Sequence, residues 1–338
     1  QEGLGNMYDK SQRLIRLAEA LHFELQSRVP VAELKRAAQL CKCDLVTGMV
    51  TEFTELQGVM GREYARLDGE KESVSEAIFE HYLPRFAGDI LPQTEPGRIL
   101  SIADKIDNIT ATFSRGKAPT GSQDPFALRR QALGIINILL EGKLDLNLEK
   151  AILAAAGLLQ VPGEKVKPLT EQVVEFIKLR FRNLLLDQKL RYDVVDAAMA
   201  DTRNTDLYDI AQRAQALQGF VAEAKAADSI QAATRVNNLS GKVEVEVPIN
   251  ETLFREEAER ALYAVVKKLD TELIAADTRC DYAGALALLA ELNGPVNRFF
   301  DDVMVMDKEE SVKKNRLALL SAVRDIMNNV GDLSKIVM

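Results

Sequence analysis

Four residues of this sequence have side chains and spacing that could bind a metal ion. Cys41 and Cys43 are two apart, and Asp104 and Asp107 are three apart in the run SIADKID. Residues three apart share one face of a helix, so the two aspartates could bind a divalent cation together. The cysteines would point to different sides of a helix, and no second Cys or His pair completes a four-ligand site. A solvated helix face is the alternative reading of the aspartates.

Nucleophilic catalysis has few candidate residues, because the sequence contains only two histidines, His22 and His81. A Ser-His-Asp or Cys-His site could use only one of them, and neither lies in a recognisable nucleophile motif. A phosphate could be held where Asp124-Pro125 predicts a helix N-terminus, with Arg129 and Arg130 one turn inside. Ordinary surface arginines are the alternative at that position.

A basic stretch at 165–193 could bind single-stranded RNA. It contains seven basic and four acidic residues, an excess of three positive charges, with Phe181 and Tyr192 interleaved. Cations hold RNA phosphates and aromatic rings stack on bases, so this composition fits such a surface. A solvated helix face is again the alternative.

Composition limits the classes of protein to which the chain can belong. It has 338 residues, 47% apolar and 28% charged, which excludes general disorder and suggests about two domains. The net charge of −8 argues against a protein that coats nucleic acid with its whole surface. Three cysteines, an odd number, favour a reducing cytoplasm. The sequence predicts neither a membrane span nor a signal peptide, and its start without Met suggests a fragment of a longer chain.

The periodicity of apolar residues is helical almost throughout, so the expected fold class is all-α with two helical domains. Ile99, Ile102, Ile106 and Ile109 form one apolar face of a helix predicted at 96–113. A helix is expected to begin at Asp124-Pro125, and QVPGEKVKP at 160–168 is the strongest candidate linker. Further helices are expected near 169–188, 191–200, 206–218, 221–239, 251–276, 281–306 and 308–330. The alternating valines at 243–247 allow at most one short strand.

Several runs of residues resemble the bacterial glycyl-tRNA synthetase beta subunit family. The resemblance extends in order over essentially the whole chain. The runs that carry it are KCDLVTGMVTEFTELQGVMGREYA (42–65), EAIFEHYLPRFAGDILP (76–92), SIADKID (101–107), PTGSQDPFALRRQALG (119–134), RFRNLLLDQKLRYDVVDA (180–197), RVNNLS (235–240), PVNRFFDDVMVM (295–306) and NRLALL (315–320).

This resemblance implies the C-terminal half of the subunit, the part that binds tRNA. We then expect an HD-like helical domain at 1–145, a linker region at 146–168 and an anticodon-binding domain at 169–338, a helical bundle similar to that of arginyl-tRNA synthetase. The implied partners are glycine tRNA, the alpha subunit and the N-terminal half of the beta subunit, in an alpha2 beta2 assembly. The implied role is to support ATP-dependent charging of glycine tRNA.

No cofactor is expected in this fragment, because the resemblance places ATP and Mg on the alpha subunit. HD hydrolases hold their metal with an upstream His, a His-Asp pair and a late Asp. The matching positions here are occupied by Cys41-Lys42, or Cys43-Asp44, and by Asp104. They lack the histidines, so we expect a degenerate scaffold without metal. A working HD phosphohydrolase around Asp44, His81 and Asp104, or a purely architectural subunit-joining module, is the alternative.

The resemblance also selects candidate tRNA contacts. In the anticodon domain these are Arg180, Arg182, Arg191, Tyr192, Arg235 and Asn238. A secondary set in the HD-like domain is Lys117, Arg129 and Arg130. Arginines would hold phosphates, Tyr192 could stack on a base and Asn238 could read a base edge. Phe299, Phe300, Val303, Met304 and Met306 are expected to pack the core instead.

Overall fold

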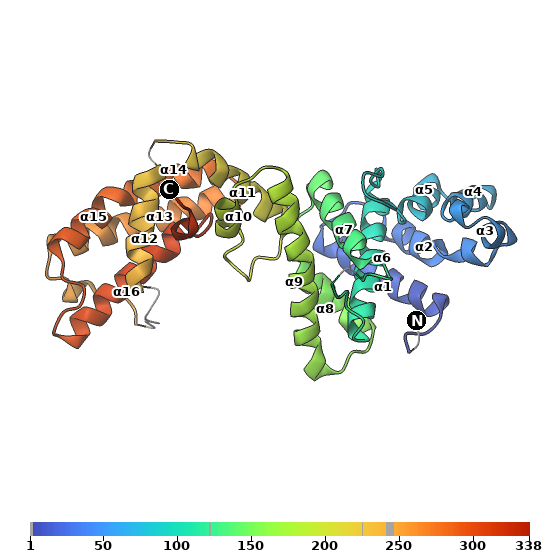
Figure 1. Ribbon diagram of the computed structural model, residues 1–338, viewed down its shortest axis with the longest axis horizontal. Helices are drawn as coiled ribbons and strands as arrows, with labels where there is room; N and C mark the ends of the chain where they lie inside the picture. Colours follow the sequence, from blue (N-terminus) through green and yellow to red (C-terminus); the bar gives the residue numbers. More distant parts are fainter. Residues whose placement is uncertain (1–2, 122, 225, 241–246) are drawn as a thin grey trace. The chain divides into compact units, whose positions relative to one another are not determined.

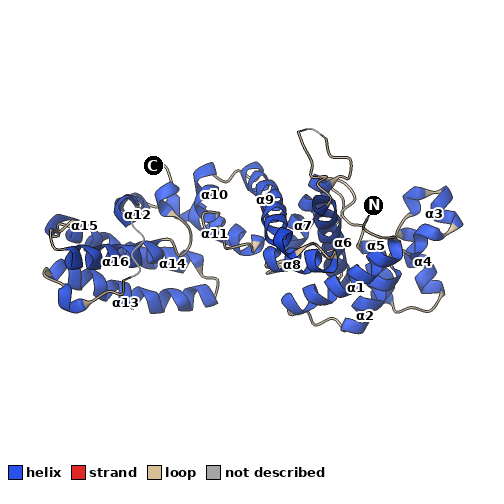
Figure 2. Ribbon diagram, turned by 90° about the horizontal axis from the view of Figure 1, so that it is seen from below, coloured by secondary structure: helices blue, strands red, loops and turns tan. Residues whose placement is uncertain are grey.

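A computed structural model describes residues 3–121, 123–224, 226–240 and 247–338, and in these ranges every regular element is a helix. Figure 2 shows the helices joined by loops, without a strand in the described parts. The prediction of an all-α fold is confirmed. Of the alternating valines at 243–247, all but Val247 lie outside the described residues.

The chain divides into two compact units. Unit 1 is Gln1–Leu184 with Thr205–Tyr208, and unit 2 is Leu185–Asn204 with Asp209–Met338. The helices up to the division are α1 (Met7–Glu24), α2 (Val31–Leu40), η1 (Cys43–Val46), α3 (Gly48–Glu52), η2 (Thr54–Leu56), α4 (Val59–Leu67), α5 (Glu72–Glu80), α6 (Glu95–Ser114), α7 (Leu128–Gly142), α8 (Leu148–Leu158) and α9 (Gly163–Asp187). Figure 1 labels the α-helices along the chain.

The core of unit 1 is built around α6, which packs against α1, α5, α7 and α8. The predicted stripe Ile99, Ile102, Ile106 and Ile109 is buried, as are most other residues of this helix. The Thr94 hydroxyl caps its N-terminus by accepting from the Gly97 amide, and Pro96 lies in the first turn, where a missing N–H costs nothing. Because α6 is buried on most of its faces, its polar residues Asp104, Lys105 and Asp107 must find partners inside the protein.

Helix α7 begins at Leu128, three residues after the expected first helical residue, Pro125. The residue before it, Ala127, has φ +52° and is left-handed, so the chain cannot be helical through that position. The Asp124 carboxylate still caps the helix, because it accepts hydrogen bonds from the Leu128 amide at 2.8 Å and the Arg129 amide at 2.9 Å.

Most of the region predicted as a linker, 146–168, is helical. Leu148 and Ile152 of α8 are buried against unit 1, and α9 starts at Gly163 and passes through Pro168. The division between the two units falls instead within α9, between Leu184 and Leu185. Gly163 lies at the start of α9 and Pro168 lies inside this helix, so the segment is not an extended connection.

Unit 2 is a bundle in which α12 packs on α15 and α16, and α13 packs on α14, α15 and α16. The predicted single helix at 281–306 is broken, because a 3-10 turn intervenes and the chain after Asp302 is extended. As a result Met304 and Met306 are exposed, against expectation, whereas Phe299 and Val303 are buried as expected. The elements are α10 (Tyr192–Ala198), α11 (Leu207–Val221), α12 (Ala226–Ser240), η3 (Glu251–Leu253), α13 (Glu257–Thr278), α14 (Tyr282–Leu289), η4 (Ala290–Leu292), α15 (Asn293–Asp302), α16 (Glu310–Met327) and η5 (Leu333–Lys335).

Candidate functional site

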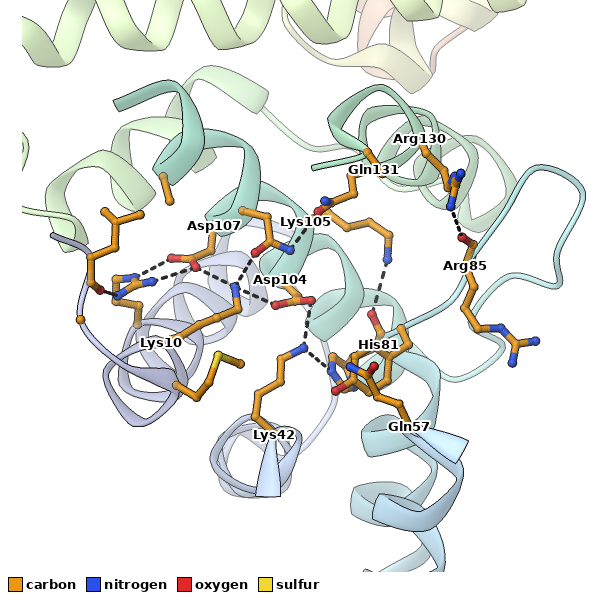
Figure 3. A pocket seen from close by; sticks show the side chains of 18 of the residues that line it. Lys10, Lys42, Gln57, His81, Arg85, Asp104, Lys105, Asp107, Arg130 and Gln131 are labelled. Carbon is orange, nitrogen blue, oxygen red and sulfur yellow. Dashed lines mark hydrogen bonds and ion pairs between the residues drawn. The ribbon is translucent and has the colours of Figure 1, made fainter. Parts of the chain in front are cut away.

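Unit 1 contains a cavity of about 560 Å³ whose lining is rich in charged side chains. They come from elements far apart in the sequence: α1, the residue after α2, the C-terminal end of α5, the middle of α6 and the start of α7. Figure 3 shows these side chains converging from their separate helices.

Asp104 is the centre of an ionic network at one side of the cavity. Its Oδ1 lies 2.9 Å from Lys10 Nζ and its Oδ2 lies 3.1 Å from Lys42 Nζ. The two lysines reach the carboxylate from different elements, as Figure 3 shows. Burial opposes ionisation of this group, but the two ammonium groups outweigh it and hold the pKa of Asp104 well below its usual range.

Asp107, one turn further along α6, is held by α1. Its Oδ2 is 2.8 Å from Lys10 Nζ and its Oδ1 is 2.7 Å from Arg13 Nε, while Arg13 also donates to the Leu4 carbonyl. The predicted sharing of one helix face by Asp104 and Asp107 is confirmed, because Lys10 bridges both carboxylates. They face cations of the protein itself.

His81 is fully buried at the end of α5, beside Lys42. Its Nδ1 lies 2.6 Å from the Ile78 carbonyl oxygen, which can only accept, so Nδ1 carries the proton. Its Nε2 then accepts from Lys42 Nζ at 2.8 Å. Burial, and next the charge of Lys42, lower the pKa of His81 well below its usual value, so the ring is neutral.

Lys105 is a buried cation that contacts no carboxylate within the described ranges. Its Nζ donates to the Leu83 carbonyl at 2.7 Å and to the Ser101 hydroxyl at 2.6 Å. Burial lowers the pKa of Lys105 to about 7. Its stem passes Gly134 of α7, where a Cβ would come within 2.9 Å of Lys105 Cε. Gly134 therefore leaves the space that the lysine fills.

The residues at the HD-like positions do not fit a divalent cation. Asp104 and His81 both face the Lys42 ammonium, which would repel a metal ion. Asp44 lies apart from them, with its Oδ2 accepting from the Gly58 amide at 2.6 Å. Burial raises the pKa of the Cys41 thiol to about 12, and Cys43 is exposed. No cluster of three or more metal-ligating side chains occurs among the described residues.

Two of the predicted tRNA contacts, Arg180 and Arg182, lie on the part of α9 that belongs to unit 1. The Arg180 guanidinium stacks on the Phe176 ring at 3.7 Å and donates to the Phe176 carbonyl at 2.6 Å. Burial, and next the nearby Arg129, lower the pKa of Arg180. The structure therefore brings Arg129 and Arg180 together, although they were predicted in different domains.

Arg191 and Tyr192 lie at the start of α10 in unit 2. Arg191 forms a two-point ion pair with Asp193, with Nε 3.0 Å from Oδ1 and Nη2 2.6 Å from Oδ2. The Tyr192 side chain is 59% exposed, so its ring is available for stacking.

Arg235 and Asn238 lie three residues apart on α12, and therefore on the same side of the helix. The Arg235 guanidinium stacks on the Phe300 ring of α15 at 4.6 Å, and one of its N–H groups donates to Asn297 Oδ1 at 3.0 Å. Asn238 is exposed. The half-buried Arg235 guanidinium thus has a defined orientation, and the exposed Asn238 amide lies on the same side of α12.

Of the secondary set, Lys117 is exposed in the loop after α6, and Arg129 donates to the Gly121 carbonyl. Arg130 is exposed at the cavity and donates to the Arg85 carbonyl at 3.2 Å. Lys10, Arg13 and Lys105 are not among the residues predicted from the sequence. Matching three-residue spacings, basic in the first helix and acidic in the sixth, are the signal that could have indicated the first two.

None of the helices in the described ranges combines the length and the apolarity that crossing a bilayer needs.

Two family models match this chain. A model of the glycyl-tRNA synthetase beta subunit matches residues 1–200, and a model of the DALR anticodon binding domain matches residues 229–338. The glycine–tRNA ligase beta subunit of Clostridioides difficile is 45% identical over 337 residues, which cover 100% of this chain and 49% of that protein. That of Desulforamulus reducens is 44% identical with the same coverage, and that of Chromohalobacter salexigens is 40% identical over 99% of this chain and 48% of its own length. The chain spans about half the length of these curated relatives.

Proposed function

The chain belongs to the glycyl-tRNA synthetase beta subunit family, and on this premise we propose that it is the tRNA-binding portion of a glycine–tRNA ligase beta subunit. The observation that carries the proposal is the surface of α12 and α15, within the segment that resembles an anticodon-binding domain. On this surface the Arg235 guanidinium stacks on the Phe300 ring, and Asn238 is exposed on the same side of α12.

This surface suits RNA for a physical reason. Stacking on Phe300 and the bond to Asn297 hold the Arg235 guanidinium in one orientation, so little side-chain freedom is lost when it contacts a phosphate. The Asn238 amide carries both a donor and an acceptor, which is what reading a base edge requires. Arg180, Arg182, Arg191 and Tyr192 are further contacts in this proposal, with Lys117, Arg129 and Arg130 as a secondary set.

The net charge of −8 is compatible with this function, because salt screens charges beyond about 8–10 Å and local cations dominate binding. We propose that the partners are glycine tRNA, an alpha subunit that binds ATP and Mg, and the N-terminal half of the beta subunit, in the cytoplasm. Charging of glycine tRNA would then take place on the alpha subunit, with this portion holding the tRNA.

The test is tRNA binding by the complete ligase that carries this chain, with Arg235 replaced by Ala. Affinity for glycine tRNA should fall about tenfold, because one well-oriented arginine contact contributes about 1–3 kcal/mol. Arg203→Ala is the matched control, since this arginine of unit 2 is 90% exposed and pairs only with Asp201 in the described residues. Equal affinities for the parent and Arg235→Ala, with Arg203→Ala also unchanged, would favour the architectural alternative.

A further inference from the structure

We propose that the cavity of unit 1 is a binding site for the phosphate group of a nucleotide-sized ligand, held by lysine and arginine side chains without a metal ion. The inference does not rest on the proposed tRNA-binding surface of α12, which lies in the other unit.

Basic side chains outnumber acidic side chains around the cavity. Two carboxylates line it, those of Asp104 and Asp107, and a third, Asp89, pairs with Arg85 nearby. Six basic side chains line it: Lys10, Arg13, Lys42, Arg85, Lys105 and Arg130. Four of these basic side chains, those of Lys10, Arg13, Lys42 and Lys105, are buried or half-buried together with only two carboxylates. Buried charge of one sign is costly unless an opposite charge compensates it, and a phosphate dianion would supply that charge.

Two of the basic side chains that line the cavity have no carboxylate partner among the described residues. Lys10, Arg13 and Lys42 already bind the two aspartates. Lys105 and Arg130 contact only neutral acceptors in the described part of the chain, namely carbonyl oxygens and one hydroxyl. The remaining N–H groups of Arg130 are therefore available to an anion that enters the cavity. Both residues belong to the same pair of packed helices, α6 and α7.

The packing of α7 on α6 leaves space for the Lys105 side chain. A Cβ at position 134 would come within 2.9 Å of its Cε, so the small residue in α7 and the long one in α6 fit each other. Glycine inside a helix costs stability relative to alanine. A buried lysine without a carboxylate costs more, and such costs persist where a side chain has a function.

The cavity is large enough to hold a small molecule, and its basic lining extends below the surface. Its volume of about 560 Å³ lies within the range of small-molecule sites and exceeds what a phosphate alone needs. Arg85 and Arg130 are exposed, whereas Lys42 and Lys105 are buried, so the cationic lining continues from the surface inward.

The same phosphate chemistry could come from a free nucleotide or from RNA. The experiment uses the complete ligase that carries this chain, with the ATP site of the alpha subunit first filled by a glycyl-adenylate analogue, and measures binding of inorganic phosphate, adenosine 5′-monophosphate and adenosine by calorimetry. Both phosphorylated probes should bind, and adenosine should bind at least about tenfold more weakly because it lacks the charged group. Adenosine 5′-monophosphate is then titrated again in the presence of saturating glycine tRNA.

Two variants and one control locate the site. Arg130→Gln removes an exposed guanidinium and is expected to fold, and it should weaken binding of adenosine 5′-monophosphate about tenfold. Lys105→Gln should weaken it at least as much. Arg66→Gln, at an exposed arginine of α4 in unit 1 that pairs with Glu72 and does not line the cavity, should change it less than about twofold.

Each result of these experiments either supports or overturns the proposed phosphate site. Binding that Arg130→Gln weakens and that tRNA leaves unchanged supports a free nucleotide as the ligand. Displacement by tRNA, together with weaker tRNA binding by Arg130→Gln, supports the same phosphate site with RNA as its source. The inference is overturned if neither phosphorylated probe binds while glycine tRNA still does, or if Arg130→Gln and Lys105→Gln leave probe binding unchanged. The proposed tRNA-binding function would survive either result.

Discussion

Glu259 and Arg316 form a buried ion pair that fastens α13 to α16 in unit 2. Arg316 Nε lies 2.9 Å from Glu259 Oε1, and Glu259 is completely shielded from solvent. The other carboxylate oxygen accepts from the backbone amides of Arg255 and Glu256, so the same side chain caps the N-terminus of α13. One carboxylate therefore both starts a helix and binds its neighbour, close to the helices that form the proposed RNA surface.

Replacing Glu259 with Gln should lower the free energy of unfolding by about 3–5 kcal/mol, because it leaves a buried arginine with less compensation. Urea unfolding measures this difference. Glu257→Gln is the matched control, since this residue lies in the same first turn and is exposed, and its effect should be within about 0.5 kcal/mol. Equal midpoints for the two variants would contradict this account of the pair.

The Glu259 carboxylate should also make stability depend on acid. Burial opposes its ionisation most strongly, but the bonds from Arg316 and the backbone amides prevail and lower the pKa of Glu259. A lowered pKa in the folded state stabilises the protein above the unfolded value of about 4.3, and this contribution is lost as the pH falls through the folded value. As the pH falls below about 5, the stability of the parent should thus decline more steeply than that of Glu259→Gln. Parallel curves would show that the carboxylate is not the titrating group.

Lys105 should give a pH dependence of the same sign, but at neutral to alkaline pH. Its pKa of about 7 in the folded state lies below the unfolded value of about 10.4, so the unfolded chain binds more protons between these values. The free energy of unfolding should therefore rise with pH from about 7 to about 10, by about 2–4 kcal/mol from this group.

The Lys105→Met variant isolates this contribution, because it should lack the rise while sharing the other titrations. Asp104, Lys42, His81, Tyr82 and Cys41 surround the ammonium group or interact with its neighbours and remain in both proteins. Urea unfolding at several pH values compares the two. An equal rise in the variant would show that Lys105 is not the source.

Two glycine-to-alanine changes should have opposite effects on stability. A Cβ at Gly97 of α6 would lie 2.0 Å from Glu80 Oε2, and Glu80 is buried and accepts from the Gln93 and Thr94 amides. Gly97→Ala should therefore cost about 1–3 kcal/mol through overpacking. Gly157→Ala in α8 meets no atom within 4 Å and should stabilise by about 0.5–1 kcal/mol. Thermal unfolding of both variants gives the comparison, and a stabilised Gly97→Ala would contradict the crowding.

Salt dependence should separate the roles of Arg235 and Asn238 in tRNA binding. If Arg235 holds a phosphate, Arg235→Gln should reduce the magnitude of the slope of log K against log salt by about 1. Asn238→Ala should leave this slope unchanged and reduce the preference for glycine tRNA over other tRNAs. Filter binding at several salt concentrations measures both quantities. An unchanged slope for Arg235→Gln would show that this guanidinium does not neutralise a phosphate.

The elements of the fold were predictable from sequence where periodicity and caps agree. Helix α6 is the clearest case, because its isoleucines recur at helical spacing and Pro96 follows a capping threonine. The prediction failed where the local conformation overrides the pattern. Ala127 adopts a left-handed conformation, which its residue type does not predict. The 3-10 turn before α15 divides a segment whose sequence pattern predicts a single helix.

The cavity could be predicted only in part. Asp104 and Asp107 were selected by their spacing, but Lys10 lies 97 residues from Asp107 in the sequence, and only packing of α1 on α6 brings them together. Lys105 was not predicted as a site residue, because nothing in the local sequence distinguishes a buried lysine from an exposed one. The proposed tRNA contacts on α9 and α12 were selected through family resemblance, since a basic helix face alone does not identify a ligand.

The fit between Gly134 and Lys105 has a consequence for how related chains diverge. The glycine is needed there for the width of a neighbour's side chain and not for its own backbone, since it lies inside a regular helix. A relative with alanine at this position should therefore carry a shorter residue in place of Lys105, and the two positions should change together across an alignment. Where the shorter residue is neutral, the cavity of that relative will contain one basic side chain fewer.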